Sequence, residues 1–531
     1  MKTKQMNIRE EAARCLLCEN APCSRACAKG DVARAIRAVR FGNEAIARQW
    51  LEGCDESDLE QAEQACIHYD RPIRIREMAS QLPEAAPVDL PSLSIEFCGL
   101  PCENPFFLAS SSICTNYEMV ARAFDAGWAG VFYKTICLDD INEVSPRFDV
   151  VHREGDKGDF TALRNMEQLS ENPPEVDFEI LHRLKQNYPN KIVVASIMGS
   201  TEEKWIELAK RAEAAGVDAV ELNFSCPQMR ATGMGSDVGQ DRELVTFFTA
   251  YVKHAVSIPV IPKMTPNITM MSDPAIGAHY AGADAISAIN TIKSVTMDER
   301  AQVSGSWAVS GLSGRAVKPI ALRFILELAI NPVLKNLKLS GIGGIETWQD
   351  ALQFIQLGCS NLQVCTAVMQ YGYRIIDDLK LGLQHYMASR GINKLSALVG
   401  EKHPISPSQA TWTATPSSSP SSTPRSVSAV AGATCPVWTA ATRPSPSATT
   451  ASPVSWAASA SAATCAASSA PPVPSVSRSV SPSAKQNNDG PKTAKSNQGG
   501  TGKPQYPLAK SHSALSNEEA TADMIATRTV F

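Results

Sequence analysis

The chain has 531 residues, long enough for two to four domains, and a formal net charge of −4 at pH 7. That near balance of charge gives no electrostatic basis for binding nucleic acid. No run of 18 apolar residues is present, so we expect no membrane-spanning helix. The polar start of the chain lacks the apolar core of a secretion signal. Fifteen cysteines without such a signal predict a cytoplasmic protein whose thiols bind metals or take part in catalysis.

Composition divides the chain into three regions. Residues 1–85 are Cys-rich with a helical pattern, and residues 88–400 alternate apolar strands with amphipathic helices. In residues 404–531 Ser, Pro, Ala and Thr dominate, and this composition has too little apolar content to fold. We therefore expect a small all-α domain, an α/β domain and a low-complexity, disordered tail.

Four cysteines within the first region have the spacing C-x2-C-x4-C-x3-C. They are Cys15, Cys18, Cys23 and Cys27. Thiolates this close in sequence can converge on one centre, and they suit an iron–sulfur cluster or zinc. Cys54 and Cys66 follow as further possible ligands. We expect a cluster, with zinc or structural thiols as alternatives, and the spacing leaves open whether Cys27 serves the first cluster or a second one.

The middle region predicts eight strands separated by helices. The strands are expected at 105–110, 130–134, 192–197, 219–223, 259–263, 285–290, 339–341 and 361–364. Helical patterns lie between most of them, for example at 202–215, 243–255 and 318–328. This alternation fits a (β/α)8 TIM barrel. A doubly wound sheet is the alternative, but no G-x-G-x-x-G follows the first strand.

A TIM barrel places its chemistry at the carboxyl ends of its strands, and in this chain those ends are polar or glycine-rich. They read Ala109-Ser110-Ser111, Lys134-Thr135, Asn223 with Cys226, Lys263, Asn290-Thr291, Gly343-Gly344 and Cys365-Thr366. Glycines after the seventh strand, followed by a helix starting near Glu346, predict a phosphate site. Two lysines inside a barrel are costly to bury unless an anion pairs with them. An electron-rich ring with a phosphate tail would supply such an anion, and FMN is a cofactor of this kind.

The stretch ELNFSCP at 221–227 ends an apolar strand on an amide, a hydroxyl and a thiol. Pro227 ends the strand because it has no N–H to donate. Residues 228–240 contain three glycines and two methionines, a composition typical of a mobile lid. We therefore interpret Cys226 as a reactive thiol rather than as a small core residue.

The motifs of the middle region resemble the catalytic domain of dihydropyrimidine dehydrogenases, in particular the catalytic subunit of the bacterial NAD-dependent enzyme. Matching blocks include NPFFLASSS, FYKTICLDDINEVSPRF, ELNFSCPQM, PKMTPNIT and SGIGGIETW. Dihydroorotate dehydrogenases share the barrel and the N-x-S-C-P core. The NMEQ block at 165–168 and the KPIALR block at 318–323 point more specifically to the pyrimidine enzymes.

The resemblance implies reversible reduction of the 5,6 double bond of uracil or thymine, with FMN as hydride donor and Cys226 as general acid. It implies substrate contacts at Asn165, Glu167, Asn223, Asn290 and Thr291. Amides suit this role because the ring edge alternates N–H and C=O groups. It implies FMN contacts at Ala109, Ser110, Lys134, Lys263, Ser313, Gly314, Gly343, Gly344, Cys365 and Thr366.

The first region, CLLCENAPCSRACA, resembles the N-terminal iron–sulfur domain of dihydropyrimidine dehydrogenases and of the glutamate synthase small subunit. The resemblance implies [4Fe–4S] clusters, although Ala28 replaces the Pro of the family motif and the downstream cysteines are reduced to Cys54 and Cys66. The chain has no dinucleotide fingerprint. The resemblance therefore implies a hetero-oligomer in which a partner subunit with FAD and an NADH site supplies the electrons.

The family's catalytic subunit ends in a ferredoxin-like domain with two CxxCxxCxxxC motifs, which residues 404–531 lack. Read in a shifted frame, the codons of residues 426–444 permit CQRCGRCYVSC. This region is thus either a frameshifted ferredoxin-like domain or a genuine flexible tail. Two other functions stay open: oxidation of dihydroorotate, and an electron-relay protein that is impaired in catalysis.

Overall fold

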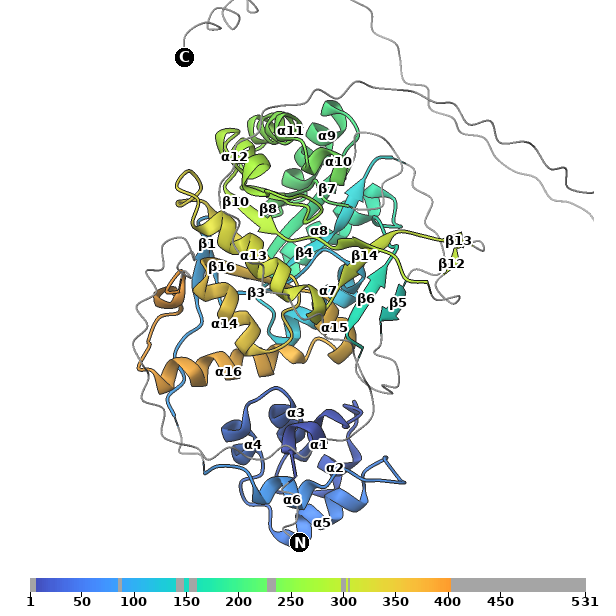
Figure 1. Cartoon of the computed structure of the whole chain (residues 1–531), viewed down its shortest axis with the longest axis vertical. Coiled ribbons are helices and arrows are strands. Elements are labelled where there is room, and N and C mark those ends of the chain that lie inside the picture. Colours follow the sequence, from blue (N-terminus) through green and yellow to red (C-terminus); the bar gives the residue numbers. More distant parts are fainter. Residues whose placement is uncertain are drawn as a thin grey trace, which may run out of the picture. The chain divides into compact units, whose positions relative to one another are not determined.

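Short helices form the first part of the described chain, and a barrel follows them (Figure 1). The computed structural model describes residues 6–84, 88–139, 148–151, 160–226, 235–297, 302–303 and 306–402. The predicted Ser/Pro/Ala-rich tail lies outside these residues, as does most of the predicted lid. Within the described ranges, no helix combines the length and the apolarity that crossing a membrane requires.

Six helices make up the Cys-rich segment. They are α1 (Ile8–Ala13), α2 (Pro22–Ala26), α3 (Val32–Arg40), α4 (Glu44–Trp50), α5 (Glu56–Gln64) and α6 (Ile75–Ser80). Side chains cap several of them; Asp55, for example, forms a capping box with Asp58 at the start of α5. On α3, Val32, Ile36 and Val39 are buried at helical spacing and belong to a hydrophobic core distinct from that of the barrel.

Eight parallel strands close into a barrel, which confirms the predicted fold class and every predicted barrel strand. The strands are β3 (Phe106–Leu108), β4 (Gly130–Cys137), β7 (Ile192–Met198), β8 (Ala219–Asn223), β9 (Val260–Lys263), β10 (Ala285–Ala288), β15 (Lys338–Ile342) and β16 (Cys359–Val364). β3 pairs with both β4 and β16, so the sheet has no free edge. The doubly wound alternative is therefore excluded.

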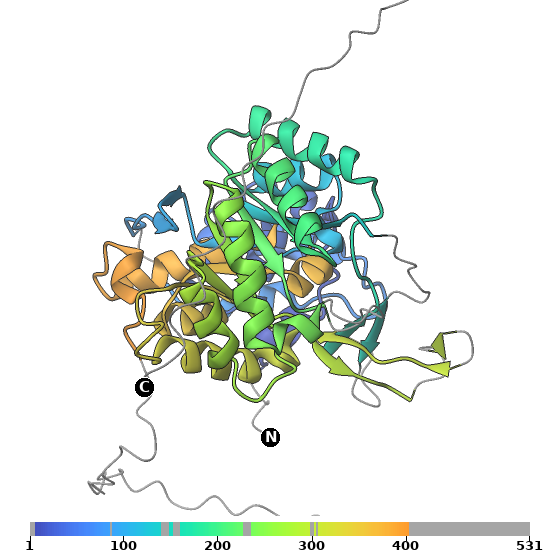
Figure 2. The ribbon, with the colours of Figure 1, turned by 90° about the horizontal axis from the view of Figure 1, so that it is seen from above.

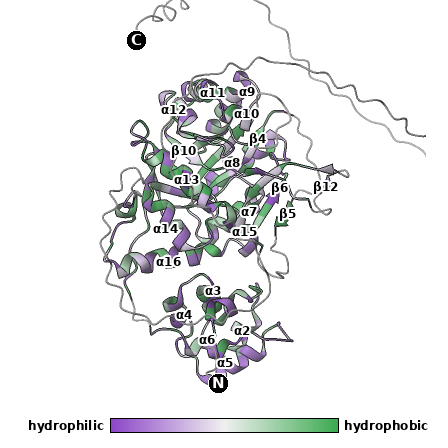
Figure 3. Cartoon of the chain, in the orientation of Figure 1, coloured by the Kyte–Doolittle hydropathy of each residue, from purple (hydrophilic) through white to green (hydrophobic). Residues whose placement is uncertain are grey.

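Helices surround the barrel, as the view from above shows (Figure 2). They are α7 (Tyr117–Ala126), α8 (Pro174–Asn187), α9 (Glu202–Ala214), α11 (Arg242–Ala255), α12 (Ser272–Tyr280), α13 (Lys318–Ala329), α14 (Trp348–Gln356) and α16 (Ile375–Ser389). Single helices carry both hydrophobic and hydrophilic colours in Figure 3, because one face packs on the strands and the other faces water.

The barrel interior changes from apolar to polar along the strands. A cluster that includes Phe107, Phe132 and Ile261 fills the end that lies toward the strand starts. The hairpin of β1 (Ile95–Phe97) and β2 (Leu100–Cys102) packs against this cluster through Phe97. Toward the carboxyl ends, the buried residues include charged and hydroxyl side chains. This polarity marks the end at which a site can form.

A second sheet, which the sequence did not predict, lies among the connections between barrel strands. Its order is β11 (Ile292–Ser294), β14 (Ser310–Ser313), β6 (Ala162–Asn165) and β5 (Phe148–Val151), and all neighbours are antiparallel. The buried side chain of Arg164 on β6 connects three strands of this sheet: it donates to Ser310 Oγ of β14 at 2.7 Å and to Asp149 Oδ2 of β5 at 3.3 Å. A small hairpin of β12 (Gln302–Val303) and β13 (Ser306–Trp307) lies nearby in sequence.

The Cys-rich helices and the barrel belong to one compact unit. Arg37 of α3 lies 2.6 Å from Asp378 of α16, and Asn43 donates to the carbonyl oxygen of Asp378 at 3.1 Å. The domain boundaries expected near residues 85 and 404 stay predictions, because residues 85–87 and 403–531 lie outside the described part of the chain.

Candidate active site

A cavity of about 1110 Å³, partly open to solvent, is lined by residues from the carboxyl ends of the barrel strands. Every residue predicted to be catalytic or to bind substrate or FMN lines it. They are Ala109, Ser110, Lys134, Asn165, Glu167, Asn223, Cys226, Lys263, Asn290, Thr291, Ser313, Gly314, Gly343, Gly344, Cys365 and Thr366. The roles of these residues stay predictions, but the structure brings all of them to one place.

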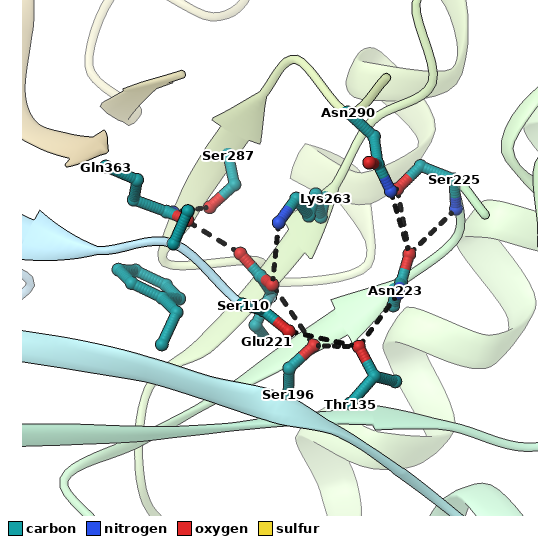
Figure 4. A network of polar contacts seen from close by, with 12 residues as sticks. Ser110, Thr135, Ser196, Glu221, Asn223, Ser225, Lys263, Ser287, Asn290 and Gln363 are labelled. Carbon is teal, nitrogen blue, oxygen red and sulfur yellow. Dashed lines mark hydrogen bonds and ion pairs between the residues drawn. The ribbon is translucent and has the colours of Figure 1, made fainter. Parts of the chain in front are cut away.

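Two of the amides in the cavity are held in fixed orientations (Figure 4). Asn223 at the end of β8 donates to Thr135 Oγ1 at 3.0 Å and accepts from Ser225 Oγ at 2.9 Å. Asn290 donates to Ser225 Oγ at 2.8 Å. Asn223 Oδ1 also accepts from the N–H of Ser225 at 3.2 Å and from Asn290 Nδ2 at 3.4 Å, and Asn290 Oδ1 accepts from the N–H of Thr291 at 2.8 Å. Because a side-chain amide has two N–H groups and two lone pairs, these contacts leave a donor on Asn223 and an acceptor on Asn290. The amides can therefore read a polar ring without reorienting.

Glu221, which is fully buried, is the central carboxylate of the barrel. Its Oε1 lies 3.4 Å from Lys263 Nζ and accepts from Ser196 Oγ at 3.1 Å, while its Oε2 accepts from Gln363 Nε2 at 3.3 Å. Lys134 pairs similarly with Glu167, at 3.1 Å between Nζ and Oε1. Both lysines thus have carboxylate partners within the chain, so their burial alone does not require an anionic ligand, contrary to the expectation from sequence.

Glycines form the part of the wall best suited to a phosphate. Gly314, Gly343 and Gly344 have φ values of +92°, +125° and +76°. A Cβ on Gly344 would lie 2.8 Å from Lys318 Cβ and 2.9 Å from the carbonyl oxygen of Gly314. Only glycine fits there, and the absence of side chains lets a ligand approach the backbone N–H groups. These positions fit the phosphate of FMN.

The helix expected to assist this phosphate site begins close to the predicted position. α14 starts at Trp348, two residues after Glu346, and Thr347 caps it. Asp350 accepts the backbone N–H groups of Glu346 and Thr347 at 3.1 and 2.8 Å. A carboxylate therefore already binds two N–H groups at this helix start. The contribution of the helix dipole to phosphate binding stays a prediction, and the glycine backbone is the second candidate anion-binding element.

Cys226 is buried and anchored through its backbone. The N–H of Ser236 donates to the carbonyl oxygen of Cys226 at 3.0 Å, which joins the end of β8 to α10 (Ser236–Gly239). A Cβ on Gly239 would lie only 2.0 Å from the carbonyl oxygen of Phe224. α10 therefore packs directly on the segment that carries the thiol. Residues 228–234 of the predicted lid lie outside the described part of the chain.

A second thiol in the cavity, that of Cys365, has different properties. Burial raises the pKa of Cys365 and outweighs a hydrogen bond with Ser111, which lowers it, while Glu167 raises it and Lys263 and Lys134 lower it to smaller extents. A thiol with a raised pKa stays protonated at neutral pH and is a poor nucleophile. Cys365 therefore suits a contact role, as expected from sequence.

Sequence reasoning missed the interior network beneath the cavity. Ser196 and Gln363 each donate a hydrogen bond to the Glu221 carboxylate inside the barrel. A signal was available, since each is a polar residue within an otherwise apolar strand, where an unpartnered polar group would be costly. Arg164 and its sheet carried no such signal, because their strands are short and irregularly spaced.

The N-terminal cysteines divide into two groups. Burial raises the pKa of Cys23 to about 11, with the neighbouring thiols of Cys15, Cys66 and Cys18 adding to the shift. Cys27 instead lies with Cys54, at 2.9 Å between the sulfur atoms. Cys66 thus lies near Cys15, Cys18 and Cys23, whereas Cys27 lies with Cys54, and which of these thiols bind a cluster stays a prediction. Chain spacing alone could not show this.

The loop at residues 15–18 has a conformation suited to holding sulfur. Leu17 has a φ of +54°, and its N–H points to Cys15 Sγ at 3.5 Å. Such N–H···S contacts tune iron–sulfur clusters. Among the described residues, no three His, Cys, Asp or Glu side chains converge closely enough for a single metal ion.

Comparisons with known proteins agree with this geometry. The family model described as dihydroorotate dehydrogenase matches residues 92–387. The Escherichia coli K12 protein named NAD-dependent dihydropyrimidine dehydrogenase subunit PreA is 51% identical over 314 residues, covering 58% of this chain and 76% of that one. The Arabidopsis thaliana chloroplastic dihydropyrimidine dehydrogenase (NADP(+)) is 38% identical over 327 residues, with the same two coverages.

More distant relatives share the barrel. The catalytic subunit of dihydroorotate dehydrogenase B (NAD(+)) from Thermococcus kodakarensis is 35% identical over 316 residues, 58% of this chain and 97% of that one. The crystal structure of Eimeria tenella DHODH in complex with ferulenol has a TM-score of 0.51 at 19% identity, covering 60% of this chain and 92% of that one, and supports the fold alone. The chain therefore belongs to the dihydroorotate dehydrogenase family, within which it is an oxidoreductase homologous to the dihydropyrimidine dehydrogenase subunit PreA.

Proposed function

We propose that the protein is an FMN-dependent dihydropyrimidine dehydrogenase that reduces the 5,6 double bond of uracil or thymine, reversibly. The observation that carries the proposal is that Asn165, Asn223, Asn290 and the Cys226 thiol line the same cavity as the glycine wall. Identity favours this activity over dihydroorotate oxidation, because the PreA relative is 51% identical and the dihydroorotate relative 35%.

The cavity has a ring-binding part and a phosphate-binding part. The bare backbone at Gly314, Gly343 and Gly344 would hold the phosphate of FMN, and Lys134 and Lys263 would lie beside its ring. When bound, FMN would supply the hydride that the pyrimidine receives at C6. The buried Lys–Glu pairs keep both ammonium groups charged yet compensated in a site sheltered from water.

Amides would recognise the pyrimidine ring. Its edge alternates N–H and C=O groups, and Asn offers both a donor and an acceptor. Asn223 and Asn290 are pre-oriented by Thr135 and Ser225, so little conformational entropy is lost when the ring binds. Asn165, Glu167 and Thr291 would contact the ring from the connections that include the antiparallel sheet. Such a site discriminates against rings that leave these polar groups unpaired.

Cys226 would act as the general acid. As hydride arrives at C6, its S–H bond breaks and a C5–H bond forms, and the thiolate then takes a proton from solvent. In the reverse direction the thiolate removes the proton from C5. A thiol suits this step because its proton is moderately acidic, so the proton can move either way.

Electrons would come from a partner subunit. The PreA relative is named as a subunit of an NAD-dependent enzyme, and we propose a hetero-oligomer in which an FAD- and NADH-binding subunit supplies electrons through [4Fe–4S] clusters. In this chain Cys15, Cys18, Cys23 and Cys66 would hold one cluster, while Cys27 and Cys54 are available for a second.

Product analysis tests the proposed activity. The FMN-loaded protein would be kept reduced with excess dithionite under anaerobic conditions and incubated separately with uracil, thymine and orotate. We expect 5,6-dihydrouracil and dihydrothymine by mass spectrometry. Formation of dihydroorotate without dihydropyrimidines would instead assign the dihydroorotate activity, and no product from any ring would favour an electron-relay role.

A further inference from the structure

Arg164 on β6 is the polar centre of the antiparallel sheet, and its side chain is fully buried. The guanidinium donates to Ser310 Oγ at 2.7 Å, Asp149 Oδ2 at 3.3 Å, the carbonyl oxygen of Ala308 at 2.9 Å and Thr296 Oγ1. These partners lie on β14, on β5 and on the stretches that follow β13 and β11. One side chain therefore connects segments from every strand of the sheet.

Apolar burial does not hold the outer part of this sheet in place. The large apolar side chains along its outer stretches are exposed to water: Val295, Met297, Trp307 and Val309. Thr296 and Ala308 alternate with these exposed residues and contact Arg164. Because exposed apolar side chains contribute no burial energy, the hydrogen bonds of Arg164 are the main contacts that fix the position of these stretches.

The opposite face of the same sheet forms part of the cavity wall. Side chains alternate between the two faces of a strand, so Asn165 points away from the face that carries Arg164. Asn165 pairs with Gly311 of β14 and lines the cavity, as Thr291 does. A Cβ on Gly311 would lie 2.2 Å from Thr291 Oγ1, so a glycine at this position lets Thr291 lie directly on the sheet. Two predicted substrate contacts therefore share one support.

We propose that Arg164 is a positioning residue for pyrimidine recognition: by fixing the sheet, it holds Asn165 and Thr291 where they meet the ring. The inference rests on the proposed function, because it takes these two side chains as ring contacts. Arg164 is not among the residues that line the cavity, so it acts through them. A small displacement of the sheet matters because a hydrogen bond weakens steeply once it is misaligned.

The geometry requires an arginine at this position rather than any buried cation. A guanidinium presents five N–H donors in fixed directions, whereas the ammonium of lysine is a point charge on a flexible stem. Arg164→Lys would keep an ion pair with Asp149, so the buried charge stays compensated. It would not bind Ser310 Oγ and the carbonyl oxygen of Ala308 at the same time. The sheet of that variant should therefore form but lose its fixed position.

The affinity for uracil, measured by isothermal titration calorimetry on the oxidised FMN-loaded protein, tests this role. We expect binding to weaken at least tenfold in Arg164→Lys and in Asn165→Ala. In the double variant the two losses should not multiply, because Arg164 acts through Asn165. The rate of dithionite-supported reduction at saturating uracil should fall less than the affinity, since Cys226 follows β8 and not this sheet. Arg37→Lys is the matched control, because Arg37 is also buried and paired with a carboxylate, but on α3.

A milder variant decides the question if Arg164→Lys does not fold. Thr296→Val removes a hydroxyl that accepts from Arg164, and we expect uracil binding to weaken roughly threefold, with no change in Val295→Thr beside it. Wild-type affinity in a folded Arg164→Lys or, where that variant does not fold, in Thr296→Val would overturn the proposal. An equal loss in Arg37→Lys, or losses that multiply in the double variant, would do the same. Unchanged affinity in Asn165→Ala would instead contradict the ring contact on which the proposed function relies.

Discussion

Lys263 and Glu221 face each other inside the barrel, with 3.4 Å between Nζ and Oε1 and almost no exposure of either side chain. The pair joins the cavity wall to the interior network, since Glu221 also accepts from Ser196 and Gln363. A charge buried this deeply is tolerated only while its partners remain. The relationship explains why a glutamate ends up within the apolar strand β8.

Glu221→Gln should therefore destabilise the protein by about 3–5 kcal/mol, because Lys263 keeps its charge without its main partner. The double variant Glu221→Gln with Lys263→Met should recover most of this loss. Urea denaturation of the FMN-loaded proteins measures both, with the exposed Glu243→Gln as control. Equal urea midpoints for wild type and Glu221→Gln would show that the ion pair does not contribute to stability.

Cys226→Ala should leave FMN bound and slow pyrimidine reduction by roughly two to four orders of magnitude, the usual contribution of one general acid. Flavin absorbance measures binding, and stopped-flow reoxidation of the reduced flavin by uracil measures the reaction. Cys365→Ala is the matched control, because its thiol lies in the same cavity but is assigned no proton transfer. If Cys226→Ala reduced uracil as fast as the wild type does, Cys226 would not be the general acid.

Gly239→Ala should disturb catalysis from outside the cavity. The added Cβ would lie 2.0 Å from the carbonyl oxygen of Phe224, so α10 or the end of β8 must move and Cys226 with it. We expect a loss of about 1–3 kcal/mol in stability and a fall of roughly 100-fold in turnover. Gly216→Ala is the control, because its φ of +86° strains the backbone without any neighbour within 4 Å. Turnover lost equally in both would indicate general destabilisation.

The interface beside α16 should depend on pH. Burial raises the pKa of Asp378 to about 7, outweighing Arg37, which lowers it, and helped by Asp377. The folded state thus binds the Asp378 proton more tightly than the unfolded chain does. The stability that protonated Asp378 contributes is therefore present at low pH and declines as pH rises from about 4 to 7. Asp378→Asn should flatten this decline in thermal midpoint, whereas Asp377→Asn should not. An unchanged profile in Asp378→Asn would contradict the assignment.

The two cysteine groups should differ in iron content. Cys18→Ser removes a member of the group of four, while Cys27→Ser breaks the pair with Cys54, which lies 2.9 Å away. We expect Cys27→Ser to retain the cluster of the first group and Cys18→Ser to lose it, with FMN retained in both. Iron analysis and EPR measure this. Loss of all iron in Cys27→Ser would instead show that Cys27 is a ligand of the cluster held by the group of four.

Much of the barrel and its cavity could be predicted because the signals are local. Apolar strands such as 130–134 and 219–223 stop on polar residues, and parallel barrel topology gathers those ends at one rim. Cys226, Asn223 and Gly343 are strand-end residues of this kind, and the structure brings them together.

What escaped prediction depends on contacts through space. Cys66 joins Cys15 although about fifty residues separate them in the chain, and spacing alone favoured Cys27. Asp350 accepts the backbone N–H groups of Glu346 and Thr347 within a capping box that the sequence analysis did not identify. The docking of Arg374 on the carbonyl oxygens of Leu17 and Cys18 has no sequence signature at all.

The most direct test of the account is a single-turnover measurement of reduced flavin in the FMN-loaded protein after mixing with uracil or with orotate. The amides at Asn165, Asn223 and Asn290 and the Cys226 thiol should let uracil reoxidise the flavin at least 100-fold faster than orotate does, a difference of about 2.7 kcal/mol in barrier. Faster reoxidation by orotate, or none by uracil, would contradict the assignment of this cavity to pyrimidine reduction.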